Sequence, residues 1–223
     1  RWAGTYSADM NERTTDDLQF GVLGSFDPVL PDAYRDTPYV FLACAQPELQ
    51  LKVIDQMRGK PLFVCDTIEF YIENHRDALT EVLRRVDGII VNDGEARMLT
   101  GEANLGRAAQ KLLAMGPRFV VLKKGEHGGL LMTGEELYPL PAYPLLDVAD
   151  PTGAGDSFAG GFMGMLAKVG KSDTAALRQA AVYGTVLASF TCEGISLNRL
   201  VHLTDEEVGE RADAFLRMLA VPK

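Results

Sequence analysis

Short apolar runs alternate with amphipathic stretches through most of the chain, and this alternation constrains the fold more than any other feature. Runs with the composition of strands recur four times, at 39–44, 61–66, 88–92 and 119–123. Amphipathic stretches with helical spacing separate them, at about 48–58, 74–85 and 104–115. Strands that are apolar on both faces and alternate with helices predict an α/β fold, with a mostly parallel sheet covered by helices on both faces.

The two ends of the chain depart from this pattern. Residues 1–24 alternate loosely between apolar and polar side chains around a turn-like stretch, which predicts a hairpin with one wet face. Runs at 128–133 and 136–140 flank Gly134-Glu135 and predict an antiparallel hairpin attached to the sheet. Helical stretches follow Pro151, at about 154–168, 173–190 and 205–219.

These patterns divide the chain into two parts. Residues 1–37 are interpreted as a partial lid of strands with a connector, and residues 38–223 as the α/β domain. The net charge of −9, from 22 basic and 31 acidic residues, argues against a nucleic-acid partner, which requires a basic face. No apolar stretch approaches the ~18 residues of a membrane span. The three separated cysteines favour a reducing cytoplasm over a disulfide framework.

The most informative segment runs from Asp150 to Gly161, where a presumed strand end at 145–148 meets a Gly-rich loop and a helix of small residues. A helix N-terminus has unpaired N–H groups and attracts anions, and glycines let backbone approach the anion closely. Asp156 in the first turn would place a base beside a bound phosphoryl group, as a kinase requires. An ordinary helix start in which the dipole favours Asp accounts equally well for this segment alone.

The helix after this loop has a mixture of small and large side chains. We expect it to be buried along one face, formed by Ala159, Gly160, Phe162, Met163 and Leu166. Side chains of such different sizes allow neighbouring elements to approach closely, so a larger residue at Gly160 is expected to overpack the interface.

Two further motifs follow predicted strands at their carboxyl ends, where α/β proteins bind ligands. Asn92-Asp93-Gly94-Glu95 places Asn92 and Glu95 three residues apart, in position for Mg²⁺ waters or phosphate oxygens. The same spacing also fits a helix N-cap pairing, which is favoured when this motif is taken alone. Lys123-Lys124-Gly125 begins the second motif, whose lysines and flexible backbone suit a triphosphate, although an ordinary charged turn has the same composition.

Together these motifs resemble the ribokinase-like, or PfkB-type, carbohydrate kinases over roughly residues 38–200, in the order and spacing of that family. The resemblance implies ATP and Mg²⁺ as cofactors, with Asp156 as the base that deprotonates a hydroxymethyl group. It implies an anion hole formed by the N–H groups of Gly153, Ala154 and Gly155. Cofactor-binding roles are implied for Asn92, Glu95, Lys123, Gly125, Gly128, Gly194 and Asn198.

Metal roles also come from the resemblance. Glu95 would hold Mg²⁺ through water, and Asp150 lies where the family often holds a monovalent cation such as K⁺. The chain departs from the family at Pro151, where Thr is more usual, and at Lys123-Lys124-Gly125, where ribokinases commonly have Thr-Leu-Gly, although Lys at the first position occurs in some relatives. These departures leave nucleotide preference and K⁺ dependence open.

Residues 1–24 resemble the family's lid, a small β-sheet that closes over the acceptor and often makes the dimer contact. Four of its side chains are candidates for touching substrate: Tyr6, Asp9, Asn11 and Arg13. Turn chemistry explains Asp9 and Asn11 equally well. A homodimer formed through the lid is the expected assembly. Family members begin with further strands upstream of the lid, so we expect the native polypeptide to be longer.

The resulting hypothesis is an ATP-dependent phosphotransferase that acts on a hydroxymethyl group of a sugar or sugar acid. A nucleoside kinase of the same fold is the alternative within the class, because the same fold and base serve adenosine-like acceptors. A non-catalytic nucleotide-binding relative is the alternative outside it, and the intact Asp156 argues against this. A dinucleotide-dependent oxidoreductase is excluded, since no G-x-G-x-x-G opens the first βα unit.

Overall fold

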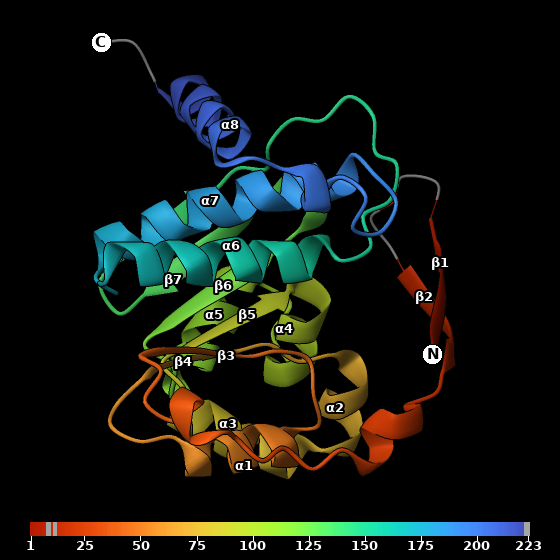
Figure 1. The fold of residues 1–223 in the computed structure, drawn as a ribbon, viewed down its shortest axis with the longest axis vertical. Helices are drawn as coiled ribbons and strands as arrows, with labels where there is room; N and C mark the ends of the chain where they lie inside the picture. Colours follow the sequence, from red (N-terminus) through yellow and green to blue (C-terminus); the bar gives the residue numbers. More distant parts are fainter. Residues whose placement is uncertain (8–9, 11–12, 221–223) are drawn as a thin grey trace.

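The computed structural model describes residues 1–7, 10 and 13–220, and its main body has three layers (Figure 1). The central sheet has the order β3-β4-β5-β6-β7-β8; its first four strands are parallel and the last two are antiparallel additions. The strands are β3 (Tyr39–Leu42), β4 (Leu62–Cys65), β5 (Gly88–Asn92), β6 (Phe119–Lys123), β7 (Gly129–Thr133) and β8 (Leu137–Leu140). This confirms the predicted mostly parallel sheet with an attached hairpin.

Helices cover both faces of the sheet. One face carries α1 (Pro47–Gln56), α2 (Glu69–Asn74), α3 (Arg76–Arg85), α4 (Asp93–Thr100) and α5 (Leu105–Ala114). The other face carries α6 (Ala154–Val169) and α7 (Thr174–Cys192), and α8 (Asp205–Leu219) packs on α7. Short 3₁₀ turns lie in the connections: η1 (Gly21–Ser25), η2 (Asp32–Tyr34), η3 (Gly125–His127) and η4 (Leu200–His202).

Alternation along β6 explains why the sheet is covered on both sides. Val120 and Leu122 point into the core beneath α1–α5, whereas Phe119 and Val121 point into the core beneath α6 and α7. All four side chains are almost completely buried. Period-2 alternation with apolar residues on both faces is therefore what places the two helical layers. No helix in the described part of the chain combines the length and the hydropathy that crossing a bilayer requires.

The segment expected to form the lid is a separate two-stranded antiparallel sheet, β1 (Trp2–Tyr6) with β2 (Arg13–Leu18). It stands at the right of Figure 1, beside the loop that leads into α6. The predicted hairpin is confirmed. Of the proposed substrate residues in it, Asp9 and Asn11 lie outside the described residues, and Arg13 begins β2.

One sequence prediction about secondary structure was wrong, and two short helices were missed. The residues 145–148 form no strand, and Leu146 is fully exposed, so their apolar composition does not reflect a place in the sheet. The helix predicted at about 74–85 is α3, and α2, which ends just before it at Asn74, was not predicted. The short helix α4 was not predicted, although its first residues were recognised as a capping pair.

The α6–α7 interface corrects the prediction about Gly160. Ala159, Phe162, Met163 and Leu166 are buried as expected, but Gly160 faces outward and a Cβ there would meet nothing within 4 Å. The close approach falls one residue later, because a Cβ on Gly161 would lie 2.9 Å from Tyr183 O. The helix therefore presents Gly161, and not Gly160, to its neighbour.

Candidate active site

The start of α6 is built by a turn that leaves backbone donors exposed. Gly153 is the N-cap and has φ of 83°, a left-handed conformation that favours glycine. The N–H groups in the first turn of an α-helix have no intrahelical acceptor, and no side chain caps this helix. The exception is Ala154, whose N–H donates to Pro151 O at 3.0 Å. The donors left for an anion in this state are therefore those of Gly155 and Asp156, next to the exposed Asp156 carboxylate.

Backbone and side-chain contacts fix the loop before α6. The Asp150 carboxylate accepts a hydrogen bond from Thr152 N at 2.9 Å, and Ala149 N donates to Cys192 O at 2.8 Å. The lid also reaches this loop, because Thr152 Oγ1 donates to the Tyr6 hydroxyl at 3.1 Å. Tyr6, one of the predicted substrate residues, therefore contacts the loop that leads into α6.

Lys123 ends β6 at the edge of the sheet where α6 begins. Its partner in the neighbouring parallel strand is Asn92, the last residue of β5. Lys123 Nζ lies against the first turn of α6, since a Cβ on Gly155 would be only 2.7 Å from it. The predicted convergence of Asn92, Lys123 and Asp156 on one edge of the sheet is confirmed.

Asn92 and Glu95 form a capping box at the start of α4. Asn92 Oδ1 accepts from Glu95 N at 2.7 Å, and Glu95 Oε2 accepts from Asn92 N at 2.8 Å. This is the helix N-cap pairing that the sequence analysis gave as the alternative for this motif. The two hydrogen bonds hold both side chains in place. The Glu95 residue is 6% exposed, so the capping box holds a nearly buried carboxyl group at this strand end.

A buried acid that was not among the predicted site residues completes the cluster. Asp66 directly follows β4 and is 8% exposed. Burial raises the pKa of the Asp66 carboxyl to about 7; Lys123 opposes this shift, whereas Asp156 and Glu95 add to it. Asp66 follows an apolar strand at its carboxyl end, as Asn92 and Lys123 do. Asn92 and Lys123 were selected because α/β proteins bind ligands at the carboxyl ends of strands. The same argument applies to Asp66, but the sequence analysis counted it only as the last residue of a predicted strand.

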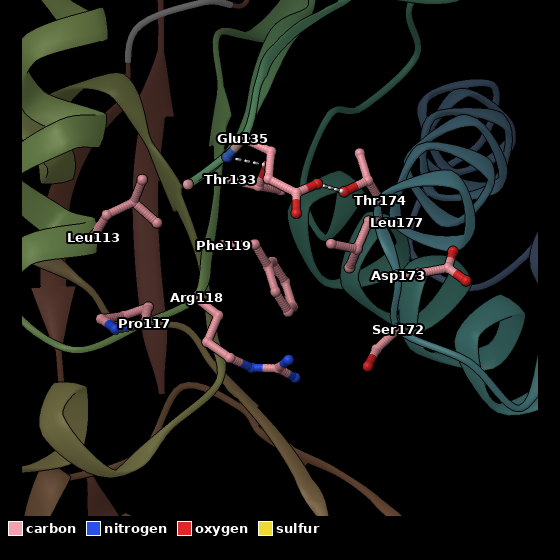
Figure 2. A pocket seen from close by; sticks show the side chains of 11 residues that line it. Leu113, Pro117, Arg118, Phe119, Thr133, Glu135, Ser172, Asp173, Thr174 and Leu177 are labelled. Atoms are coloured by element: carbon pink, nitrogen blue, oxygen red, sulfur yellow. Dashed lines mark hydrogen bonds between the residues drawn. The ribbon is translucent and has the colours of Figure 1, made fainter.

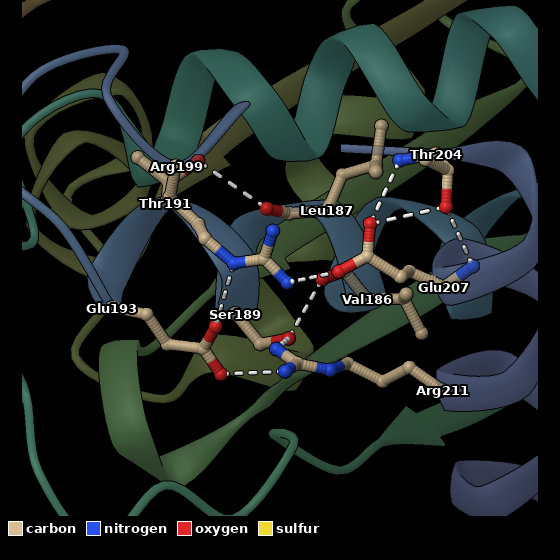
Figure 3. Close-up of polar contacts among 9 residues, drawn as sticks. All are labelled: Val186, Leu187, Ser189, Thr191, Glu193, Arg199, Thr204, Glu207 and Arg211. Atoms are coloured by element: carbon tan, nitrogen blue, oxygen red, sulfur yellow. Dashed lines mark hydrogen bonds and ion pairs between the residues drawn. The ribbon is translucent and has the colours of Figure 1, made fainter. Parts of the chain in front are cut away.

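The residues expected near an adenine lie in a loop that an ionic network holds (Figure 3). Arg199 and Arg211 both reach Glu193, at 3.4 and 2.6 Å, and Arg211 also donates to Ser189 Oγ at 3.0 Å. The Arg211 guanidinium lies 3.4 Å from the centroid of the Phe190 ring. This network fixes the segment that contains Gly194 and Asn198, but no contact joins either residue to Asp156 among the described residues.

Gly128 has a structural reason to be glycine in the turn after β6. Its φ is 73°, and a Cβ there would lie 2.2 Å from Leu140 O. Gly128 O also accepts a hydrogen bond from Lys124 N at 2.7 Å, which closes the turn that contains Gly125. These two predicted cofactor-binding glycines therefore shape the loop that follows Lys123.

A hollow of about 540 Å³ lies at the opposite, amino end of the strands (Figure 2). Arg118, Glu135 and Leu177 are among its lining residues, and Glu135 accepts a hydrogen bond from Thr174 Oγ1. The lining contains none of the convergent residues at the carboxyl edge. The candidate active site is therefore identified by the charged and polar residues at the carboxyl edge of the sheet and not by this hollow.

Comparison with known proteins identifies the family. The chain belongs to the pfkB family of carbohydrate kinases, whose family model matches residues 47–198. A cytidine kinase from Thermococcus kodakarensis is 37% identical over 139 residues, which cover 60% of this chain and 49% of that protein. A nucleoside kinase from Methanocaldococcus jannaschii is 25% identical over 160 residues, 71% of this chain and 50% of that protein. The chain spans about half the length of these relatives.

Solved structures show the same fold. The M. jannaschii nucleoside kinase, a member of the ribokinase family, has a TM-score of 0.71 and 22% identity, over 95% of this chain and 67% of that one. Aminoimidazole riboside kinase from Salmonella enterica, complexed with aminoimidazole riboside and an ATP analog, has a TM-score of 0.70 and 20% identity, over 80% of this chain and 63% of that one. The ribokinase-like fold is therefore established.

Proposed function

We propose that the protein is an ATP-dependent phosphotransferase that transfers the γ-phosphoryl group to a hydroxymethyl group of a small acceptor. The observation that carries this proposal is the placement of Asp156 and Lys123 at the uncapped N-terminus of α6. An anion-binding helix end, an ammonium group and an exposed carboxylate supply the electrostatic stabilisation and the base that phosphoryl transfer requires.

Asp156 is the proposed general base. Its carboxylate is exposed in the first turn of α6, next to the N–H groups that have no intrahelical acceptor. As the acceptor oxygen attacks the γ-phosphorus, Asp156 accepts the hydroxyl proton. The N–H groups of Gly155 and Asp156, with that of the N-cap Gly153, stabilise the charge that develops on the phosphoryl oxygens. Ala154 joins them only if its hydrogen bond to Pro151 O opens.

The residues around the site suit a nucleotide with Mg²⁺. When bound, Mg²⁺ would neutralise charge on the phosphates; Glu95 would hold it through water, and Asn92 would orient Glu95 through their capping box. Gly125 and Gly128 let the loop after Lys123 approach the phosphates closely. Beyond these residues, Gly194 and Asn198 are proposed to flank the adenine.

We also propose that Asp150 binds a monovalent cation such as K⁺, which would make turnover depend on K⁺. Its carboxylate holds the turn before the anion hole by accepting from Thr152 N. A monovalent cation bound there would act on the geometry of this turn rather than on the transferred group. Turnover in K⁺ compared with Na⁺ at equal ionic strength tests the assignment, and equal rates would remove it.

Two acceptor classes remain candidates. A sugar or sugar acid suits the family as a whole, which includes matches named ribokinase and 2-dehydro-3-deoxygluconokinase. A nucleoside is favoured by a specific observation: cytidine, nucleoside and aminoimidazole riboside kinases all match this chain. In either case the reacting group is a primary alcohol, and in the nucleoside it is the hydroxymethyl group of the ribose.

The lid is proposed to cover the acceptor and to form a homodimer contact. Tyr6 links it to the Thr152 loop, so lid position and anion-hole geometry are coupled. A two-stranded sheet is marginally stable by itself, and pairing with a second lid would compensate for this. Sedimentation equilibrium tests the dimer, and a monomer at micromolar concentration would contradict it.

An acceptor panel tests the proposed function. The protein is incubated with Mg-ATP and either pyrimidine nucleosides, purine nucleosides, free pentoses and hexoses, or a sugar acid. Phosphorylated product is detected by mass spectrometry. We expect one class to be turned over with a kcat/KM well above the others. ATP binding without any phosphorylated product would instead support a non-catalytic nucleotide-binding relative.

A further inference from the structure

Two neighbouring hollows lie at the amino ends of the strands, at the opposite end of the sheet from the candidate active site. The larger, of about 540 Å³, is the one in Figure 2, and a second of about 240 Å³ adjoins it. Arg118 and Ser172 line both hollows, so one molecule can occupy the two together. The larger hollow alone has the volume of a small-molecule site.

Positive charge collects around the smaller hollow. Lys60, Arg118 and Lys171 line it together with one acid, Asp87. The three cations come from three separate loops, which precede β4, β6 and α7, in a chain whose net charge is −9. Neither lysine has an ion pair or a hydrogen bond in the part of the chain that the structure describes. Like charges around one hollow repel each other and attract an anion into it.

Arg118 is held in place by Asp87. Its Nε donates to Asp87 Oδ1 at 2.9 Å and its backbone N to Asp87 O at 2.8 Å, while Asp87 Oδ2 accepts from Phe63 N at 2.9 Å. This contact leaves both Nη groups of Arg118 without a hydrogen-bond partner among the described residues. Figure 2 shows the guanidinium pointing toward Ser172, across the hollow. A guanidinium in a fixed orientation suits two-pronged recognition of an anion such as phosphate.

The larger hollow carries groups that bind hydroxyls. Thr133, Glu135 and Thr174 line it beside the apolar Leu113 and Leu177. Glu135 Oε2 accepts from Thr174 Oγ1 at 3.3 Å, and Glu135 Oε1 has no hydrogen-bond partner among the described residues. A carboxylate accepts hydrogen bonds from alcohols and repels a second anionic group. A molecule that fits both hollows would therefore carry its negative charge at one end and hydroxyl groups at the other.

We propose that the two hollows form a second binding site, for a phosphate monoester of a small hydroxylated molecule, the chemistry of a sugar phosphate. The phosphate lies in the smaller hollow, between the Arg118 guanidinium and the ammonium groups of Lys60 and Lys171. The hydroxylated part lies in the larger hollow, against Glu135. Three cations at one end favour a dianionic phosphate over a carboxylate. The site shares no lining residue with the candidate active site and does not depend on the proposed function.

Calorimetric titration of the protein tests this site, with ribose 5-phosphate as the probe and inorganic phosphate and ribose as comparisons. We expect ribose 5-phosphate to bind at least about tenfold more tightly than either comparison compound, because it reaches both hollows. The double variant Lys60→Met, Lys171→Met should weaken its binding about tenfold. Arg118→Lys keeps the charge but loses the planar fork, so it should weaken binding as well.

Two matched variants separate this site from the overall charge and from the active site. Lys168→Met removes the same charge from an exposed position on α6 that lines neither hollow, and it should leave the dissociation constant unchanged. Lys123→Met removes the cation at the carboxyl edge of the sheet and should also leave it unchanged. Lys60 and Lys171 are exposed, so their double variant should keep the wild-type midpoint in urea.

Four results would overturn the inference. The first is wild-type protein that is folded and binds no ribose 5-phosphate. Equal affinities for ribose 5-phosphate and inorganic phosphate would contradict the ligand class. Loss of binding in Lys123→Met, with binding retained in the Lys60 and Lys171 double variant, would place the phosphate at the carboxyl edge. An effect of Lys168→Met per charge as large as that of the two lining lysines would show that only net charge matters.

Discussion

Replacing Asp66 by Asn should stabilise the protein above pH 7. Burial raises the pKa of this carboxyl from 3.8 to about 7. Because the folded-state pKa is the higher one, folding favours the protonated acid. That stabilisation is complete below pH 3.8 and is lost as the pH rises through about 7. At about 1.4 kcal/mol for each pKa unit, ionised Asp66 destabilises the fold by up to about 4 kcal/mol.

Urea denaturation followed by circular dichroism measures this effect. Asn is neutral at every pH, so the stability difference between Asp66→Asn and wild type should grow between pH 4 and 7 and level off above pH 7. We expect a gain of about 2–4 kcal/mol at pH 8. Asp87→Asn serves as the comparison, and it should destabilise the protein because it weakens the contacts to Phe63 N and Arg118. A difference at Asp66 that does not change with pH would refute the reasoning.

Three further predictions follow from the packing and the lid. Gly161→Ala should lower the free energy of unfolding by ~1–3 kcal/mol, because its Cβ would meet Tyr183 O, whereas Gly160→Ala should raise it by about 0.5–1 kcal/mol; chemical denaturation of both variants checks this pair. Tyr6→Phe should raise KM for the acceptor and leave ATP affinity unchanged, as steady-state kinetics would show. Arg211→Met should lower the free energy of unfolding in urea by ~1–3 kcal/mol, because Ser189 and Glu193 lose their charged partner.

The sheet was predictable because its strands carry an unambiguous pattern. Short strands that are apolar on both faces are stable in a sheet that helices cover on both sides. Two of them, β5 and β6, begin and end at the predicted residues. The residues 145–148 have similar composition but remain exposed, since local composition does not report whether a neighbouring strand is available for pairing. α2 and α4 were missed because six- and eight-residue helices contain too few turns for a clear period.

The site was predictable where a motif coincides with a strand end. Asn92, Lys123 and Asp156 lie on the same edge because parallel strands deliver their carboxyl ends there. Asp66 was missed because it was counted as the last residue of a strand and carries no motif; its burial and the charges that act on it arise only in the fold. The sequence also did not predict that Gly161, and not Gly160, contacts α7. The rotation of a helix about its axis is fixed by packing against its neighbours.

The effect of Asp156→Asn on turnover tests the central claim most directly. With the acceptor identified by the panel, kcat and the dissociation constant for the ATP analogue are measured for wild type and variant in the natural-length protein. Asn keeps the shape of the side chain but does not accept the proton, so we expect kcat to fall about 10²–10⁴-fold, while the dissociation constant changes little. A variant that retains near-wild-type kcat would contradict the assignment of Asp156 as the base.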